Sequence, residues 1–227
     1  MSIASLFEVI ADEVHEKGYD KGELDVWNCF TKNGTRTNYY NAFLGTDFSN
    51  KTIPQGLCKP RLRVHSMFYQ YGGRYLPSGI DCSEFDVSGT TDMHAYGLFY
   101  YAMSLIEIPD ILLPAQKSYE RAYYGCGSLV SIAVIRSNAD TIWKNTFTGS
   151  SKIESLSIEG VIGTNGFDIS PTQRINKTSL LSIIGALADY STDTSGTKWV
   201  CTLGSANLAK LTDAEKAIAT EKGWSLA

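Results

Sequence analysis

The fold is decided by three copies of one pattern: FYYAMSLIEI (99–108), YYGCGSLVSI (123–132) and FTGSSKIESL (147–156). Each copy starts 24 residues after the previous one and carries an aromatic residue, a small residue three positions later, and aliphatic residues six and nine positions later. A fixed period of this length is typical of stacked supersecondary units, none of which can bury its apolar face alone. The spacing therefore predicts a stack of similar repeat units, which begin at Phe99, Tyr123 and Phe147.

The second half of each copy predicts one short β-strand. Three segments are rich in β-branched and aliphatic residues and alternate towards their ends: 104–108, 128–134 and 152–158. Stacking the units would place these strands in one parallel sheet. Beneath the sheet we expect an aliphatic ladder of Leu105, Leu129 and Ile153. Beside it we expect an aromatic stack of Phe99, Tyr123 and Phe147.

The pattern resembles the BspA type of leucine-rich repeat, which is found in bacterial surface proteins. The resemblance covers roughly residues 64–160, and Ile108-Pro109 keeps the proline that follows the strand in that family. Segments 203–226 and 33–43 are similar to the C-terminal and N-terminal parts of repeat proteins encoded in tail and baseplate gene regions of phages and prophages of gut Firmicutes. The resemblance implies a phage setting and supplies no catalytic residues.

We therefore expect an α+β chain built as a short leucine-rich-repeat-like solenoid with parallel strands, N-terminal helices and a C-terminal α/β cap. The expected parts are an N-terminal helical assembly or docking segment (1–34), an irregular flanking coil with loops (35–96), the solenoid (97–174) and the cap (175–227). Phe68, 31 residues before Phe99, would open a degenerate first repeat, with Arg74 at the position of the expected leucine.

The cap is predicted from helix signals at its two ends. An apolar stripe over 180–187 predicts a helix capped by Thr178, and 198–203 predicts a strand. A second helix would begin at a capping box of Thr212 and Glu215, end at Gly223, and be followed by a final strand over 224–226. We expect that helix to turn three residues inward: Ala214, Ala217 and Ile218.

An apolar stripe near the N-terminus predicts an assembly helix. Its members follow a heptad-like spacing: Ile3, Leu6, Phe7, Ile10 and Val14. Two interpretations stay open, in which the helix either caps the end of the solenoid or associates with copies of itself and attaches the protein to a larger body. We favour self-association because the stripe is so apolar, and we expect a trimer by analogy with fibres.

Loops rich in tyrosine and glycine predict adaptable recognition surfaces. Segments 70–75 and 90–96 have this composition. The candidate recognition residues are Tyr69, Tyr71, Arg74, Tyr75, His94 and Tyr96. The alternative is that these tyrosines only pack the sides of a thin solenoid.

Catalytic and metal-binding motifs find no support in the sequence. None of the three histidines lies in a hydrolase or zinc motif, and the acidic residues lack calcium-loop spacing, so we expect no catalytic residues, no metal and no cofactor. The glycine-rich segment 160–166 lacks a lysine and predicts a tight turn. The five cysteines form no C-x-x-C pair, which favours buried thiols in a reduced compartment.

Charge and hydropathy narrow the partners. A net charge of −4 without a basic stripe argues against nucleic acid. No apolar run approaches the roughly 20 residues needed to span a bilayer, and the start lacks the basic region of a signal peptide. We expect synthesis in the host cytoplasm and a place in the virion.

The expected function is that of a non-enzymatic virion structural protein of a tail, baseplate or fibre. It would self-assemble through its N-terminal helix and contact other virion proteins, or a glycan or protein of the host surface, through its repeat domain. The alternative is a bacterial leucine-rich-repeat surface module for adhesion or interaction. A third interpretation, an enzyme that cleaves glycans, would need paired carboxylates in one groove.

Overall fold

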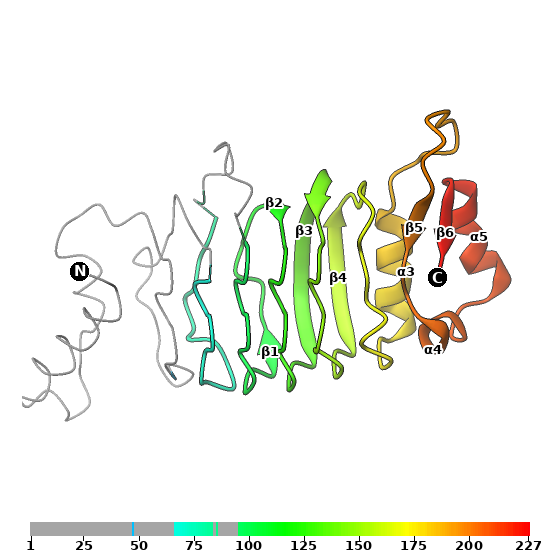
Figure 1. Cartoon of the computed structure of the whole chain (residues 1–227). Helices are drawn as coiled ribbons and strands as arrows, with labels where there is room; N and C mark the ends of the chain where they lie inside the picture. The colour runs from blue at the N-terminus through cyan, green and yellow to red at the C-terminus, as the bar shows by residue number, and fades with distance from the viewer. Residues whose placement is uncertain (1–46, 48–65, 84, 86–94) are drawn as a thin grey trace, which may run out of the picture.

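The computed structural model describes residues 47, 66–83, 85 and 95–227, which form an α+β structure with parallel strands. Its elements, in chain order, are β1 (Glu107–Ile108), β2 (Gln116–Ser118), β3 (Ser131–Ile142), β4 (Ser155–Gly160), α3 (Lys177–Ala186), β5 (Trp199–Cys201), α4 (Ser205–Leu208), α5 (Asp213–Glu221) and β6 (Trp224–Leu226). Figure 1 shows β1, β3 and β4 following one another along the molecule, with the helices gathered at the C-terminal end. The predicted assembly helix and His94 lie outside the described residues.

The strands pair in the register that the repeat predicts. Strand β1 is parallel to β3, with Ile108 opposite Ile132, and β3 is parallel to β4, with Ile132 opposite Leu156. Each partner lies 24 residues further along the chain. The parallel pairing of equivalent residues is therefore confirmed for these three units.

The strand boundaries differ from the prediction. Each strand begins two residues after the ladder residue, because the chain is still turning there: the N–H of Leu105 donates to the carbonyl of Ala102, and that of Leu129 to Cys126. Strand β3 is longer than expected, since its second half pairs with β2, a strand that the sequence did not predict. The three ladder residues themselves are fully buried in one hydrophobic cluster that extends from Met67 to Trp224.

The predicted aromatic stack is present and extends one ring further. Ring centroids lie 5.8 Å apart for Phe99 and Tyr123, and 5.6 Å apart for Tyr123 and Phe147, with nearly parallel planes. Phe68 stacks on Phe99 at 4.9 Å, and Tyr75 forms a parallel bridge with Glu107. Residues near Phe68 therefore continue the stack despite their longer spacing of 31 residues.

The small residue has a hydrogen-bonding role in the second and third copies of the repeat. The thiol of Cys126 donates to the carbonyl of Phe99 at 3.0 Å, and the hydroxyl of Ser150 donates to the carbonyl of Tyr123. Ser150 also accepts the backbone N–H of Cys126 at 3.0 Å. The buried Ala102 of the first copy shows that this position needs a short side chain, which in the other two copies also bonds to the preceding unit.

The C-terminal part contains the predicted helix, strand, helix and strand in that order, but it adds the short helix α4 between β5 and α5 and differs in two further details. Helix α3 is capped by Asn176, whose side chain accepts the Ser179 N–H at 2.8 Å, so Thr178 is inside the helix and the predicted cap was wrong. The capping box at the start of α5 and the left-handed Gly223 (φ 83°) are confirmed, as is strand β6, which pairs with β5.

The inward face of α5 was also predicted wrongly. Its buried residue is Ala219, whereas Ile218 is 39% exposed and neither Ala214 nor Ala217 is buried. The helix packs against α3 and β6, and an ion pair of 2.9 Å between Lys177 and Glu215 joins it to the start of α3. Only one turn of this nine-residue helix is therefore covered.

Close approach between units explains the glycine-rich turn. A Cβ on Gly160, whose φ is 101°, would lie 2.1 Å from the carbonyl oxygen of Ser137. A Cβ on Gly163 would lie 2.3 Å from that of Ala139. The tight turn is confirmed.

The three described cysteines, Cys82, Cys126 and Cys201, are buried free thiols, as predicted. Within the described chain, no helix has the length and apolarity that crossing a membrane requires.

Candidate interaction surface

A row of tyrosines runs along the turn side of the stack. In the units of Phe68, Phe99 and Tyr123, a tyrosine directly follows the core aromatic residue. The rings of these tyrosines also stack, Tyr69 on Tyr100 at 5.4 Å and Tyr100 on Tyr124 at 5.0 Å. Tyr101 packs edge-on against both Tyr100 and Tyr124. We call this surface the tyrosine wall, and its members are Tyr69, Tyr96, Tyr100, Tyr101, Tyr124 and Arg121.

The backbone of each turn has two positions in the left-handed region. The first is occupied by Gly97, Arg121 and Asn145, with φ of 58°, 55° and 55°, and the second by Tyr101, Gly125 and Gly149, with φ of 55°, 71° and 79°. Glycine and asparagine adopt this conformation readily, whereas other residues pay about 1–2 kcal/mol. Arg121 and Tyr101, which belong to the tyrosine wall, depart from this rule, and so do Ser66 and Gln70 at the equivalent positions of the Phe68 unit, with φ of 51° and 50°.

Arg121 is held within the wall by a phenol. Its Nη1 donates to the hydroxyl of Tyr96 at 2.9 Å, and its pKa is raised by the interaction with Tyr96. Burial raises the pKa of Tyr100, and the charge of Arg121 opposes that rise. The Nε of Arg121 is buried and has no hydrogen-bond partner in the described part of the chain.

The structure divides the predicted recognition residues among three places. Tyr69 and Tyr96 lie in the tyrosine wall. Tyr71 is 1% exposed and donates its hydroxyl to the carbonyl of Tyr75 at 2.8 Å, so it packs in the core. Arg74 and Tyr75 are exposed next to β1.

Sequence reasoning missed most of the wall. The sequence did not predict four of its members: Tyr100, Tyr101, Tyr124 and Arg121. The recognition residues were predicted from loops rich in tyrosine and glycine before residue 97, whereas these four lie within the repeats. A signal was present, since an aromatic residue directly follows the core aromatic in YYG at 123–125, in FYY at 99–101 and in FYQ at 68–70.

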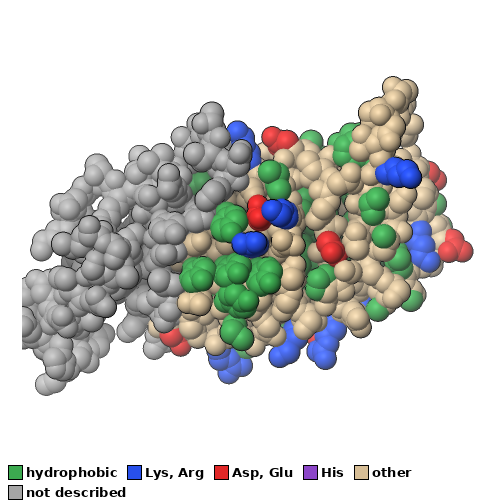
Figure 2. All heavy atoms as spheres, viewed as in Figure 1, with side chains coloured by type: hydrophobic (Ala, Val, Ile, Leu, Met, Phe, Trp, Pro, Cys, Tyr) green, Lys and Arg blue, Asp and Glu red, His purple; other side chains and the backbone are tan. Residues whose placement is uncertain are grey.

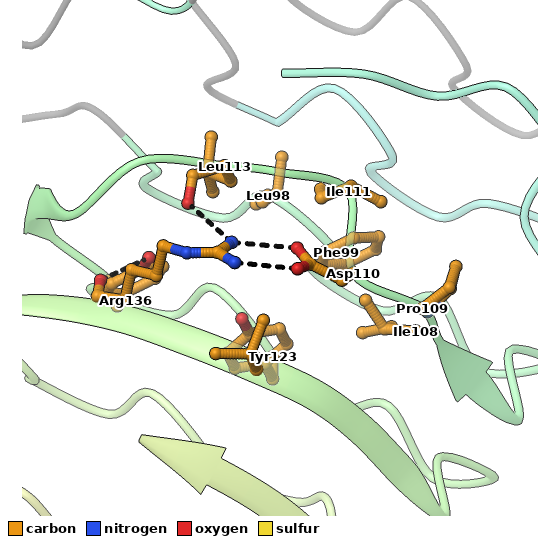
Figure 3. Close-up of a pocket in the computed structure, with 11 residues that line it drawn as sticks. Leu98, Phe99, Ile108, Pro109, Asp110, Ile111, Leu113, Tyr123 and Arg136 are labelled. Atoms are coloured by element: carbon orange, nitrogen blue, oxygen red, sulfur yellow. Dashed lines mark hydrogen bonds and ion pairs between the residues drawn. The ribbon is translucent and has the colours of Figure 1, made fainter. Parts of the chain in front are cut away.

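A second exposed feature lies on the strand side. Arg136 holds the loop between β1 and β2 by donating to both carboxylate oxygens of Asp110 at 2.8 and 2.7 Å (Figure 3). Its Nε also forms an ion pair of 3.0 Å with Glu159. The loop leaves Leu112 47% exposed. Figure 2 shows hydrophobic side chains gathered near this region of the surface, beside basic and acidic groups.

The hollow beneath this ion pair is too small for a substrate. Its cavity volume of about 10 Å³ is the space of roughly one water molecule. Among residues 47, 66–83, 85 and 95–227, His, Cys, Asp and Glu side chains form no group of three that could hold a metal ion. At this place the surface offers exposed side chains for contact, among them Leu112.

Comparisons of the chain with protein-family models, with curated proteins and with solved structures found no match. A functional assignment therefore depends on the geometry of the repeat stack, on the tyrosine wall and on the resemblance noted in the sequence.

Proposed function

We propose that the protein is a non-enzymatic virion component of a phage tail, baseplate or fibre. It assembles through its N-terminal helix and contacts a neighbouring protein or the host surface through its repeat domain. In this proposal the stacked units are a leucine-rich-repeat-like solenoid, and the segment from α3 to β6 is its cap. The 24-residue register carries the proposal, because it lines up side chains from successive units into one continuous contact surface.

The chemistry of the tyrosine wall supports a binding role. Tyrosine supplies a large amphipathic contact area at low cost in conformational entropy, and stacking orders these rings before a partner arrives. Aromatic residues, arginine and methionine are enriched at interfaces, and Met103, next to the wall, is 61% exposed.

Ring geometry narrows the kind of contact. Because Tyr69, Tyr100 and Tyr124 stack face to face, the middle ring has both faces covered and leaves only its edge for a partner. Such a row favours hydrogen bonds to a partner over stacking of a sugar ring on an aromatic face.

Backbone strain supports the same role. Residues held in costly conformations cluster at functional sites, and two of the bulky left-handed residues, Tyr101 and Arg121, lie in the wall. Gln70, at the position equivalent to Tyr101 in the Phe68 unit, and Leu112, on the strand side, are left-handed outside it. A purely structural turn would be more stable with glycine at the position of Tyr101 or of Arg121.

Particle association tests the proposed function. Virions purified on a density gradient from an induced lysate should contain the chain at constant stoichiometry to the tail proteins, measured by quantitative mass spectrometry. Its absence from particles, together with its presence on the bacterial cell surface, would favour the alternative of a bacterial adhesion module.

Mass photometry tests the assembly claim. The full chain should form a discrete oligomer, and a variant lacking residues 1–18 should be a monomer. An unchanged monomer before and after truncation would remove self-assembly from the proposal. Circular dichroism of the truncated variant should match the full chain apart from the lost helix.

A further inference from the structure

We propose that Arg121 and the hydroxyl of Tyr100 form a binding site for an anionic group, a phosphodiester or a carboxylate, carried by a polymer of the host surface. This inference rests on the proposed function and names the ligand class of the tyrosine wall. Three independent features of the described residues carry it: the charge of Arg121 has no carboxylate partner, its backbone conformation is costly, and hydroxyl groups flank it.

Arg121 has no carboxylate of the described residues within ion-pair distance, although the nearby charge of Glu120 contributes to its raised pKa. Arg136 is paired with Asp110 and Glu159, and Arg174 with Glu154, whereas the exposed Arg74 resembles Arg121 in forming no ion pair with the described residues. Arg121 makes no ion pair within the described residues, and the neighbouring carboxylate of Glu120 is paired with Lys144 at 3.3 Å. A half-buried guanidinium without an anion is an open partner for carboxylate or phosphate, whose geometry its fork of donors matches.

The left-handed backbone conformation at position 121 is energetically costly for arginine. The equivalent residues one unit before and one unit after are Gly97 and Asn145, both suited to the same left-handed backbone. Its single hydrogen bond to Tyr96 holds the guanidinium in place and leaves Nε without a partner in the described chain. A ligand contact accounts for an arginine at this position, whereas turn formation does not.

The surroundings of Arg121 add donors of the right kind. The guanidinium donates to the Tyr96 hydroxyl at 2.9 Å and lies 5.9 Å from the centre of the Tyr96 ring, while Tyr101 and Tyr124 lie against Tyr100. Phenol hydroxyls and a guanidinium together present several hydrogen-bond donors, which suits an oxyanion. The stacked rings follow the direction of the repeat, so an extended polymer would contact several hydroxyls in succession.

The binding experiment uses the full chain and three polymers. Poly(glycerol phosphate) and polygalacturonate supply the two anion sources, and neutral dextran is the control; affinity is measured by biolayer interferometry. We expect binding to one of the two anionic polymers that weakens with added salt, and no binding to dextran.

The variants separate binding from folding. Arg121→Gly removes the guanidinium and relieves the backbone, so we expect an unchanged or higher melting temperature together with about a tenfold or greater loss of affinity. Arg121→Lys keeps the charge and should lose less, since lysine lacks the planar fork. Asn145→Gly makes the same backbone change one unit later and should leave affinity unchanged.

Three results would overturn the inference: no binding of the full chain to either anionic polymer, full affinity in Arg121→Gly, or equal affinity for dextran. Incorporation of the Arg121→Gly chain into virions is measured as well, so that failure of the ligand site can be distinguished from failure of the proposed function. Arg121→Gly chains should enter particles normally, and their loss from particles would make Arg121 an assembly contact and refute the ligand site.

Discussion

The hydroxyl of Ser150 ties its own unit to the preceding one through two hydrogen bonds, and its removal should be costly. The side chain is fully buried, donates to the carbonyl of Tyr123 and accepts the N–H of Cys126. Neither backbone group has another hydrogen-bond partner among the described residues. Ser150→Ala therefore leaves one buried donor and one buried acceptor unsatisfied, while changing the side-chain volume very little.

The expected cost follows from these two groups. Each buried, unsatisfied backbone group costs about 1–3 kcal/mol, so the two groups together should lower the free energy of unfolding of Ser150→Ala by about 2–6 kcal/mol. Equilibrium unfolding in urea measures this as a lower midpoint with an unchanged slope. Ser150→Cys should lose less, because Cys126 occupies the equivalent position and its thiol donates to a carbonyl.

The neighbouring residue provides the matched control. Ser151 is exposed, and Ser151→Ala should change stability by no more than about 0.5 kcal/mol. If Ser150→Ala also stays within about 0.5 kcal/mol of the unmodified chain, the hydrogen-bonding account of the small repeat position is refuted.

Two further predictions concern close approach and charge. Gly160→Ala should destabilise the fold by more than about 2 kcal/mol in urea unfolding, because the new Cβ would meet the carbonyl of Ser137. The control is Gly185→Ala, inside α3 with open space around it, which should stabilise the fold by up to about 1 kcal/mol. Equal effects of the two substitutions would contradict the close stacking at Ser137. The hydrogen bonds from Arg136 hold the pKa of Asp110 below its usual value, so their contribution is present above the unfolded pKa of about 4 and is lost as the pH falls below it. Urea midpoints at pH 7 and pH 2.5 should therefore differ less in Arg136→Met than in the unmodified chain, and an identical difference would refute the role of this pair.

The repeat was predictable because residues of the same kind recur at equivalent positions of each copy. Leu105, Leu129 and Ile153 share one spacing, and the same spacing fixes which residues face each other across β1, β3 and β4. Local helix signals also sufficed where they were specific, as at Thr212 and Glu215.

The misses arose where tertiary contacts decide between local options. Both Asn176 and Thr178 can cap a helix, and the hydrogen bond from the Asn176 N–H to Glu154 selects the first by fixing the backbone before α3. Strand β2 could not be foreseen, because Gln116 and Ser118 have no apolar alternation and pair only because β3 extends beside them.

The tyrosine wall was found only in part for a related reason. Tyr69 and Tyr96 were chosen from loop composition, which says nothing about neighbours in space. The stacking of Tyr69 on Tyr100 joins segments that are far apart in sequence and offset from the regular period. The left-handed conformation of Arg121 is likewise visible only once the turns are superimposed on Gly97 and Asn145.

Nuclear Overhauser effects between ring protons test the stacking of equivalent residues most directly. In a sample with selectively protonated phenylalanine and tyrosine, the ring of Tyr123 should show cross-peaks to both Phe99 and Phe147, since the centroids lie 5.8 and 5.6 Å away. Assigned spectra in which Tyr123 contacts neither ring would contradict the 24-residue stack.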